Sequence, residues 1–370
     1  MNNNKARFFE LSLLNVSLCM MVIFIHVSAT PVTNLDPSSG QYLLVMIPWR
    51  LAGFVVQGFI FLSGLKLLMS KANSFAYGQL LLNRLSVVIL PYVVWVLIYY
   101  IFFVWKSYLQ FDLTALLHYI FVGDLVGHLY FVIVIAQFYI LAPVWIKLVK
   151  NTSAAVLILI ALVVTIISSQ NFPDIVKFFS PGSNFLYTDR IFLTYLVYWI
   201  AGCYAGLYYE RFKEILRNNR VYITIFFIIA ATGNLLFSYF EYNGMGKISR
   251  LDDLHLVYCL SAILFFFVVA LLITDNNFPQ PGSLVTRLIN NLDRTSYGVY
   301  LAHCLPIFIV DGFLLSTNFS ISECYLIRFL TVYAVAISGA LLWRYLRDGQ
   351  GSGNIRLGDN EEKDSSLRSE

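Results

Sequence analysis

The sequence has little charge for its length. Only 12% of its 370 residues are charged, whereas 59% are hydrophobic, and the mean hydropathy is +0.72. A soluble domain carries about a quarter charged residues and about half apolar ones. This composition therefore excludes a water-soluble globular protein. The formal net charge of +4 is too small to indicate a nucleic-acid partner.

Cysteine is also scarce, and its pattern carries no chemistry. All five cysteines lie in or beside apolar runs, at no spacing typical of zinc ligands: Cys19, Cys203, Cys259, Cys304 and Cys324. An odd, apolar set is unlike a disulfide framework as well. We therefore interpret the thiols as small core residues and expect no metal and no tightly bound cofactor.

Three further absences narrow the class of protein to which the chain can belong. The sequence lacks the weak alternation over about 10 residues that marks a transmembrane barrel. It has no evident internal repeat, which many transporters carry. It also has no Gly-x-x-x-x-Gly-Lys loop to hold a nucleotide for powered export. These absences favour a helical membrane protein and disfavour a transporter.

Long apolar runs recur along the whole chain instead. A run of about 20 residues spans a bilayer as a helix, so we expect an all-α polytopic membrane bundle of about ten transmembrane helices. The expected spans are roughly 9–30, 42–68, 82–105, 127–147, 153–169, 190–210, 221–240, 254–274, 296–316 and 323–346. The first is interpreted as a retained span, because no clean cleavage site follows it.

Outside the spans the sequence is simple. Residues 111–125 are half apolar and predict a short interfacial helix. No soluble domain fits between the spans, so residues 1–347 are expected to form one transmembrane domain. The tail, 348–370, is polar and rich in Gly and Ser, which predicts a disordered cytoplasmic segment.

The basic residues predict an orientation. Of the 25 Lys and Arg residues, 18 fall near span ends on the side of the N-terminus. Five fall on the other side: Lys106, Lys177, Arg190, Lys247 and Arg250. Since cytoplasmic loops carry the excess of Lys and Arg, both termini are expected to be cytoplasmic, in the cell (plasma or inner) membrane.

Polar groups at membrane depth are costly and indicate a cavity or a partner. With a rise of about 1.5 Å per residue, His26, Arg50 and His128 fall at a similar level toward the outer face. Glu10, Asn15, Arg84 and the stretch from Thr295 to His303 fall toward the cytoplasmic face. The sequence thus predicts two polar levels, provided that the spans concerned are neighbours.

Each of these residues also has a purely structural interpretation. A lone membrane histidine such as His26 often just bonds a neighbouring helix, and Arg84 at a helix end can extend to the interface. Asp311 and Arg328 are expected to form a structural pair, and His118 and His255 to be surface groups. The residues alone leave an enzyme and a transporter both open.

Five motifs follow one another along the chain: Glu10 through Ile25-His26-Val27, Phe59-Ile-Phe-Leu-Ser63-Gly64, Arg84 leading to Pro91-Tyr92, Gly127-His128-Leu-Tyr130-Phe131 with Pro143, and Ser296-Tyr297-Gly298-Val-Tyr300-Leu-Ala-His303. In this order they resemble the membrane acyltransferase-3 family, which O-acylates cell-envelope and exported sugars. The segment Ala201-Gly-Cys-Tyr-Ala-Gly-Leu-Tyr-Tyr-Glu210-Arg211 is similar to the biofilm-exopolysaccharide subgroup, described both as polysaccharide exporters and as succinyl- or acetyltransferases.

The resemblance implies a chemistry. It implies acyl-CoA as the donor, a hydroxyl of a polysaccharide or of its lipid-linked precursor as the acceptor, and His26 as the catalytic base or the covalent acyl carrier. It places Arg84 on the phosphates of CoA. Arg50, His128 and Tyr130 are candidates by depth to bind the oxyanion. Glu10, Asn15, Tyr297 and His303 complete the expected substrate-binding set, and components of a polysaccharide synthase are expected protein partners.

The sequence departs from the family pattern at three places. Asn15 stands where many members have an arginine, eleven positions before the histidine. Ser86, Val87 and Val88 stand where a second basic residue is common, and Gln57 replaces a proline. These departures leave three interpretations open: a different donor, a different way of binding it, or loss of acyl transfer with the fold retained. The alternative function is a polysaccharide exporter without acyl-transfer chemistry; a scaffold of a synthase complex explains none of the buried histidines.

Overall fold

The computed structural model describes residues 8–69, 77–182, 185–244 and 251–366, and every regular element in these ranges is a helix. The first half consists of α1 (Phe9–Asn34), α2 (Gly40–Ala52), α3 (Val55–Met69), α4 (Tyr77–Trp105), α5 (Leu113–Val122), α6 (Tyr130–Ile140), α7 (Ala142–Asn151) and α8 (Ala154–Phe179). The second half consists of the 3-10 turns η1 (Thr188–Arg190) and η2 (Phe192–Tyr195), then α9 (Leu196–Leu207), α10 (Tyr209–Asn218), α11 (Arg220–Tyr242), α12 (Leu251–Asp275), α13 (Leu284–Ala302), α14 (Cys304–Leu314) and α15 (Ile321–Ser366).

The helix bundle confirms the predicted all-α membrane class. Seven helices of the described chain are long and apolar enough to span a bilayer, and two bent pairs raise the number to nine. The bent pairs are α6 with α7, at 59°, and α13 with α14, at 50°. The sixth expected span, 190–210, corresponds to a shorter apolar helix, Phe192–Leu207. The predicted interfacial helix corresponds to α5, which Asp112 caps by accepting a hydrogen bond from the Thr114 amide at 2.8 Å.

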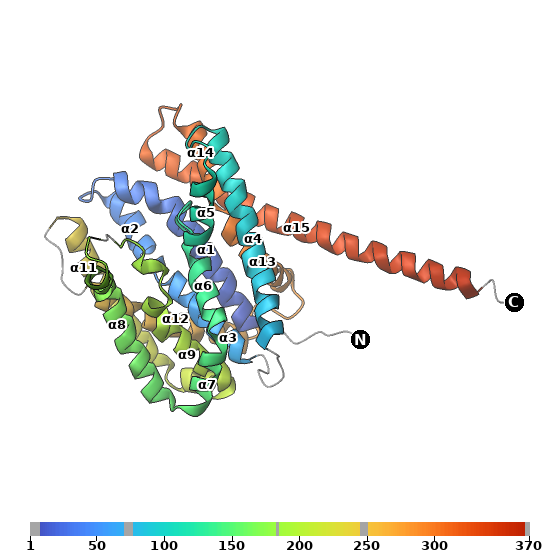
Figure 1. Ribbon diagram of the computed structural model, residues 1–370, viewed down its shortest axis with the longest axis horizontal. Helices are drawn as coiled ribbons and strands as arrows, with labels where there is room; N and C mark the ends of the chain where they lie inside the picture. The colour runs from blue at the N-terminus through green and yellow to red at the C-terminus, as the bar shows by residue number, and fades with distance from the viewer. Residues whose placement is uncertain (1–7, 70–76, 183–184, 245–250, 367–370) are drawn as a thin grey trace.

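Helix α1 lies at the centre of the bundle (Figure 1). It packs against α2, α3, α12, α13 and α15. Its position follows from its sequence, because apolar residues on several faces are buried, among them Val22, Ile23 and Val27. A helix that is apolar all round must be covered by neighbours or by lipid. Of its polar side chains, Glu10, Ser12 and Ser28 are buried in the protein interior.

Glycines allow α3 and α9 to pack in close contact. Gly202 and Gly206 are four residues apart on one face of α9, where an added Cβ would overlap the backbone carbonyls of Phe61 and Leu65. Gly64 of α3 makes the reciprocal approach, since a Cβ there would lie 2.6 Å from the Trp199 carbonyl. Small residues at this spacing let membrane helices approach closely, where dispersion attraction holds them together. The family-like segment from Ala201 thus forms a helix interface.

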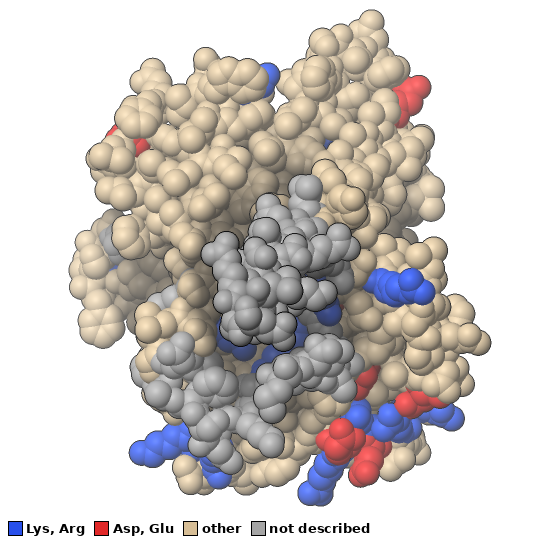
Figure 2. Space-filling view, turned by 90° about the vertical axis from the view of Figure 1, so that its right-hand side faces the viewer, with Lys and Arg blue, Asp and Glu red and all other residues tan. Residues whose placement is uncertain are grey.

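Charged side chains collect at one end of the molecule. Figure 2 shows most of the Lys, Arg, Asp and Glu side chains of this face toward its lower end, below a broad uncharged region. This distribution fits a chain that crosses a bilayer, whose core disfavours charge. Six of the counted cations lie outside the described residues: Lys5, Arg7, Lys71, Lys247, Arg250 and Arg368. The cytoplasmic placement of both termini stays a prediction.

The last span and the first part of the tail, for which the sequence predicts disorder, belong to the same helix, α15. Residues 348–366 continue α15 as a helix that projects away from the bundle (Figure 1). A helix satisfies its backbone hydrogen bonds internally and needs no core to do so. The division into a transmembrane domain, 1–347, and a disordered tail stays a prediction.

Candidate active site

Three histidines from three parts of the chain meet inside the bundle. His26 comes from α1, His128 from the loop before α6, and His303 from the junction of α13 and α14. Their ring centroids lie 5.7 Å apart for His26 and His128, 5.0 Å for His26 and His303, and 4.6 Å for His128 and His303. His128 and His303 are fully buried, and His26 is partly buried. We call these three residues the histidine cluster. The expected cytoplasmic level of His303 was wrong, because α13 begins at Leu284, well before the expected span start at 296, and carries His303 to the level of His26.

The bend between α13 and α14 orients two of the histidines. A broken helix leaves backbone carbonyls without their usual amide partners, which is tolerated at membrane depth only where other groups satisfy them. Here the Leu301 carbonyl accepts from Tyr99 Oη at 2.8 Å and from His128 Nε2 at 3.3 Å. The Tyr300 carbonyl accepts from His303 Nδ1 at 2.6 Å. The break therefore supplies the acceptors that fix the imidazole rings.

These contacts also assign the tautomers. A carbonyl can only accept, so the hydrogen of neutral His128 sits on Nε2 and the hydrogen of neutral His303 sits on Nδ1. His128 Nδ1 is buried without a hydrogen-bond partner in the described chain, and it is left as a bare acceptor. Neutral His128 thus cannot donate to an oxyanion, the role for which its depth made it a candidate. Its bare Nδ1 can only accept a hydrogen bond.

A thiol completes the cluster. Cys304 Sγ lies 3.4 Å from His303 Nε2. One potential ligand atom each from His26, His303 and Cys304 falls within 4.8 Å of the others, so these are the described residues that could hold a metal ion together. Sequence spacing could not indicate this group, because the fold joins residues that lie far apart in the chain.

A cavity of about 180 Å³ adjoins the histidine cluster. Tyr300 forms its wall on that side, with its ring centroid 5.4 Å from that of His128 and its hydroxyl donating to the His128 carbonyl. The rest of the lining comes from α1, α3, α4, α6 and α13: Asn15, Phe59, Ser63, Val88, Phe131, Val132, Ile135, Tyr139, Ser296 and Tyr297. Tyr297 donates to the Val88 carbonyl at 2.6 Å. The cavity is therefore built of aromatic walls with a few polar groups, as ligand sites commonly are.

Polar residues mark the other side of this cavity. Asn15 donates to Asp293 Oδ1 at 2.7 Å and to Ser296 Oγ at 2.8 Å. The guanidinium of Arg84 lies 5.2 Å from the ring centroid of Tyr139, a lining residue. Asn15 thus lines the cavity directly, whereas Arg84 lies behind the lining residue Tyr139 and the histidine cluster lies behind the lining residue Tyr300.

Glu10 belongs to a separate contact. It is buried, accepts from Tyr209 Oη at 2.8 Å, and lies 3.9 Å from Lys213 Nζ. Burial, with the Glu10 carboxylate beside it, raises the pKa of Tyr209 well above its ordinary value, so that this hydroxyl remains a donor. Glu10 therefore ties α1 to α10, and none of its described contacts involves Arg84.

Arg50 does not meet the histidine cluster in the described contacts. Arg50 Nη2 donates to Asn234 Oδ1 at 2.9 Å, and His255 Nδ1 lies 3.2 Å from the same oxygen. This group joins α2, α11 and α12 instead. It also corrects the view of His255 as a surface residue, since His255 is partly buried and its Nε2 lies 3.5 Å from Cys259 Sγ.

Tyr130 and the remaining candidates occupy other places. The Arg190 guanidinium lies 5.9 Å from the Tyr130 ring centroid, so the described partner of Tyr130 lies outside the histidine cluster. His118 is about half exposed and lies 3.2 Å from Asp124, as expected of a surface group. The predicted pair is confirmed, with Arg328 Nε donating to Asp311 Oδ1 at 2.6 Å.

Sequence reasoning missed three residues of this region. Tyr300 belongs to a family-like motif, but the sequence predicts no role for it. It stands three residues before His303 and so shares a helix face with that residue. Asp293 and Cys304 carried no signal of their own, because neither matches a spacing that implies a ligand. Only the packing of α13 against α1 shows that Asp293 meets Asn15.

A membrane helix bundle with a histidine cluster beside an aromatic cavity defines a membrane-embedded protein with a buried polar site. A family model described as an acyltransferase domain matches residues 10–343. The chain therefore belongs to the membrane acyltransferase-3 family and is an acyltransferase. Comparisons with curated proteins and with solved structures gave no match.

Proposed function

We propose that this acyltransferase moves an acetyl or succinyl group from acyl-CoA to a hydroxyl of an exported polysaccharide or of its lipid-linked precursor. One observation carries the proposal. A single cavity has Asn15 and Tyr139, the neighbour of Arg84, on one side and Tyr300, the neighbour of the histidine cluster, on the other. The donor handle Arg84 and the histidine cluster are thus each separated from the same space by one aromatic side chain.

The donor enters from the side of Arg84. A guanidinium can bind phosphate oxygens with two parallel hydrogen bonds, which suits the phosphates of CoA. Asn15 and His26 are eleven residues apart on α1, which is a rise of about 16 Å. An extended arm of CoA that follows this direction brings its thioester toward Tyr300 and His26. Since Asn15 is already bonded to Asp293 and Ser296, this chain relies on Arg84 where relatives have further basic residues.

His26 acts on the acceptor hydroxyl. A neutral imidazole has one ring nitrogen with a free lone pair, which can accept a proton from a hydroxyl as a general base. The sugar oxygen attacks the thioester carbonyl carbon while its proton moves to His26. The new C–O ester bond forms, the C–S bond breaks, and the leaving CoA sulfur takes up a proton. Backbone carbonyls hold the rings of His128 and His303 in place. These two rings pack beside His26 and position it. The ring nitrogens of His128 and His303 that carry no hydrogen face the protein interior.

Replacing His26 with alanine tests the proposal. General-base catalysis contributes about 10²–10⁴-fold in rate, so glycan-bound acyl groups should fall below detection by mass spectrometry of surface glycan. Protein level and polymer secretion should stay normal. His118→Ala is the matched control, because His118 is an exposed histidine outside the cavity. Acylation that persists in the His26→Ala cells, together with lost secretion, would refute acyl transfer at this site and favour the exporter.

A further inference from the structure

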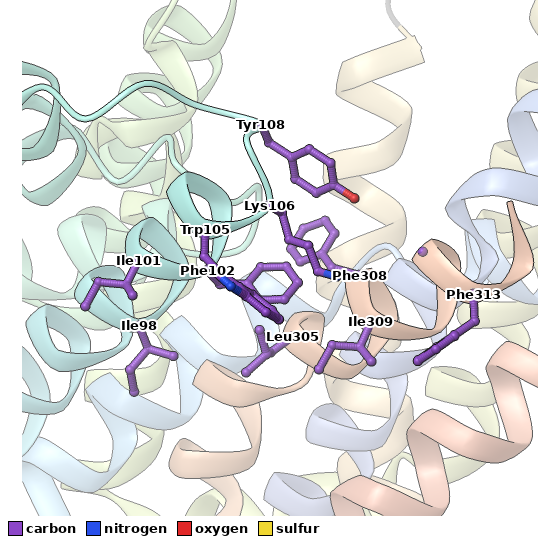
Figure 3. A pocket seen from close by; sticks show the side chains of 11 residues that line it. Ile98, Ile101, Phe102, Trp105, Lys106, Tyr108, Leu305, Phe308, Ile309 and Phe313 are labelled. Carbon is purple, nitrogen blue, oxygen red and sulfur yellow. The ribbon is translucent and has the colours of Figure 1, made fainter.

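A second and larger cavity lies at the edge of the bundle, between α4 and α14. Its volume is about 580 Å³, within the range of about 300–1,000 Å³ typical of ligand pockets. Figure 3 shows side chains of α4, including Ile98, Ile101 and Phe102, on one side and those of α14, including Phe308 and Ile309, on the other. We call this cavity the α4–α14 groove. Its lining is almost wholly apolar, which suits a hydrocarbon chain rather than a sugar.

One layer of aromatic rings separates this groove from the histidine cluster. Phe308, which lines the groove, has its ring centroid 6.3 Å from that of Tyr99. The ring centroid of Tyr99 is in turn 6.0 Å from that of His128. In sequence, Leu305 of the groove follows His303 by only two residues. A molecule seated in the groove therefore lies beside the proposed site of acyl transfer.

The upper end of the groove in Figure 3 carries a positive charge. Lys106 Nζ lies 4.6 Å from the ring centroid of Trp105, with Tyr108 nearby in the same lining. Trp, Tyr and Lys gather where hydrocarbon meets lipid headgroups. Lys106 is exposed, and the ion pairs of the described chain do not include it. The groove thus offers an apolar channel that ends at a cation near headgroup level.

We propose that the α4–α14 groove binds the hydrocarbon chain of a lipid-linked glycan, with the lipid phosphate paired to Lys106. This inference rests on the proposed function, because it identifies which form of the sugar acceptor the enzyme uses. The apolar lining with Lys106 at one end matches a lipid that has a hydrocarbon chain and a phosphate. Seating the chain there holds the attached sugar near the histidines, which raises its effective concentration at the site.

Gly312 provides a direct test of occupancy. A Cβ added at Gly312, which lines the groove, meets no other atom within 4 Å, so the space beside it is open. Gly312→Leu should fill this space with little effect on folding. Gly339→Leu is the matched control, since Gly339 also has open space but lies on α15 outside the groove. Lys106→Gln removes only the charge.

The probe is a radiolabelled polyprenyl phosphate, titrated against the full chain in phosphatidylcholine nanodiscs. We expect Gly312→Leu to weaken binding by roughly tenfold or more, because the chain would overlap the new side chain. Lys106→Gln should weaken it by roughly threefold, as for an exposed ion pair. Gly339→Leu should bind as the unaltered chain does. Equal binding by Gly312→Leu and Gly339→Leu overturns the inference, as does displacement of the probe by an equal amount of phosphatidylglycerol.

The outcome is separable from that of the proposed function. His26→Ala should bind the probe normally, since His26 does not line the groove. Normal probe binding with acylation that persists in His26→Ala would sustain the groove and refute the proposed catalysis. Loss of acylation in His26→Ala with full acylation in Gly312→Leu would sustain the catalysis and refute a lipid-held acceptor.

Discussion

Adding one methyl group at Gly202 should loosen the bundle at the wall of the active site. A Cβ at Gly202 or Gly206 overlaps a backbone carbonyl of α3, and at Gly64 it lies 2.6 Å from the Trp199 carbonyl. Backbone atoms cannot rotate away as a side chain can, so α3 and α9 must separate. We expect the three alanine variants to be destabilised, with Gly202→Ala and Gly206→Ala more affected than Gly64→Ala.

The size of the effect follows from two opposing terms. Alanine stabilises a helix by about 1 kcal/mol relative to glycine, whereas overpacking a tight contact costs about 1–3 kcal/mol, and more where backbone must move. We therefore expect Gly202→Ala to lower the free energy of unfolding by about 2 kcal/mol, which for a chain of 370 residues corresponds to a fall in midpoint of about 3 °C. Acyl transfer should fall as well, since Phe59 and Ser63 of α3 line the cavity.

Thermal unfolding in detergent, followed by tryptophan fluorescence, measures this effect. Gly339→Ala and Gly233→Ala serve as controls, because a Cβ meets nothing within 4 Å at the first and only Leu254 methyl groups at 3.7 Å at the second. Both should match or exceed the original midpoint. If Gly202→Ala unfolds at the same temperature as these controls, close approach of α3 and α9 is not what holds this wall together.

Three further variants test the site and its support. Arg84→Ala should raise the KM for acyl-CoA by roughly tenfold or more with kcat little changed, because a charge-assisted hydrogen bond contributes about 1.5–3 kcal/mol. Steady-state kinetics in nanodiscs measures both constants, and a fall in kcat alone would contradict a role of Arg84 in donor binding. Asn15→Ala removes two hydrogen bonds and should lower the free energy of unfolding by about 1–3 kcal/mol in a denaturant titration; an unchanged midpoint argues that the bonds to Asp293 and Ser296 contribute nothing. Arg328→Met leaves the partly exposed Asp311 carboxylate unpaired and should cost roughly 2 kcal/mol, less than for a fully buried pair; restored stability in Arg328→Met with Asp311→Leu would confirm that the pair is the cause.

The membrane class and most spans could be predicted from the sequence because bilayer thickness imposes a length on each apolar run. The two bent pairs were missed, because 127–147 and 296–316 were each expected as one continuous span, with no break at Leu141 or His303. The sixth expected span, 190–210, contains the shorter apolar helix Phe192–Leu207, which follows the turn η1. Length along the sequence did not show where the regular helix begins.

For His26 and His128 the depth was predicted but the lateral position was not, and for His303 the predicted depth was wrong. Helical rise placed His26, Arg50 and His128 at one level, and His26 and His128 do lie together. Arg50 lies instead with Asn234, because α2 packs against α11 there. Helical rise gives one coordinate for each residue. The other two depend on which helices are neighbours, and that follows from contacts such as the glycine interface of α3 and α9.

The break at His303 has a consequence for how such an enzyme can change its acceptor. Two imidazoles take their orientation from main-chain oxygens of residues 300 and 301, and every amino acid supplies such an oxygen. Substitutions on the surrounding helices can thus reshape the space for a new sugar without turning these two rings. Natural variation is then expected to concentrate in the walls, while the bend in the helix persists.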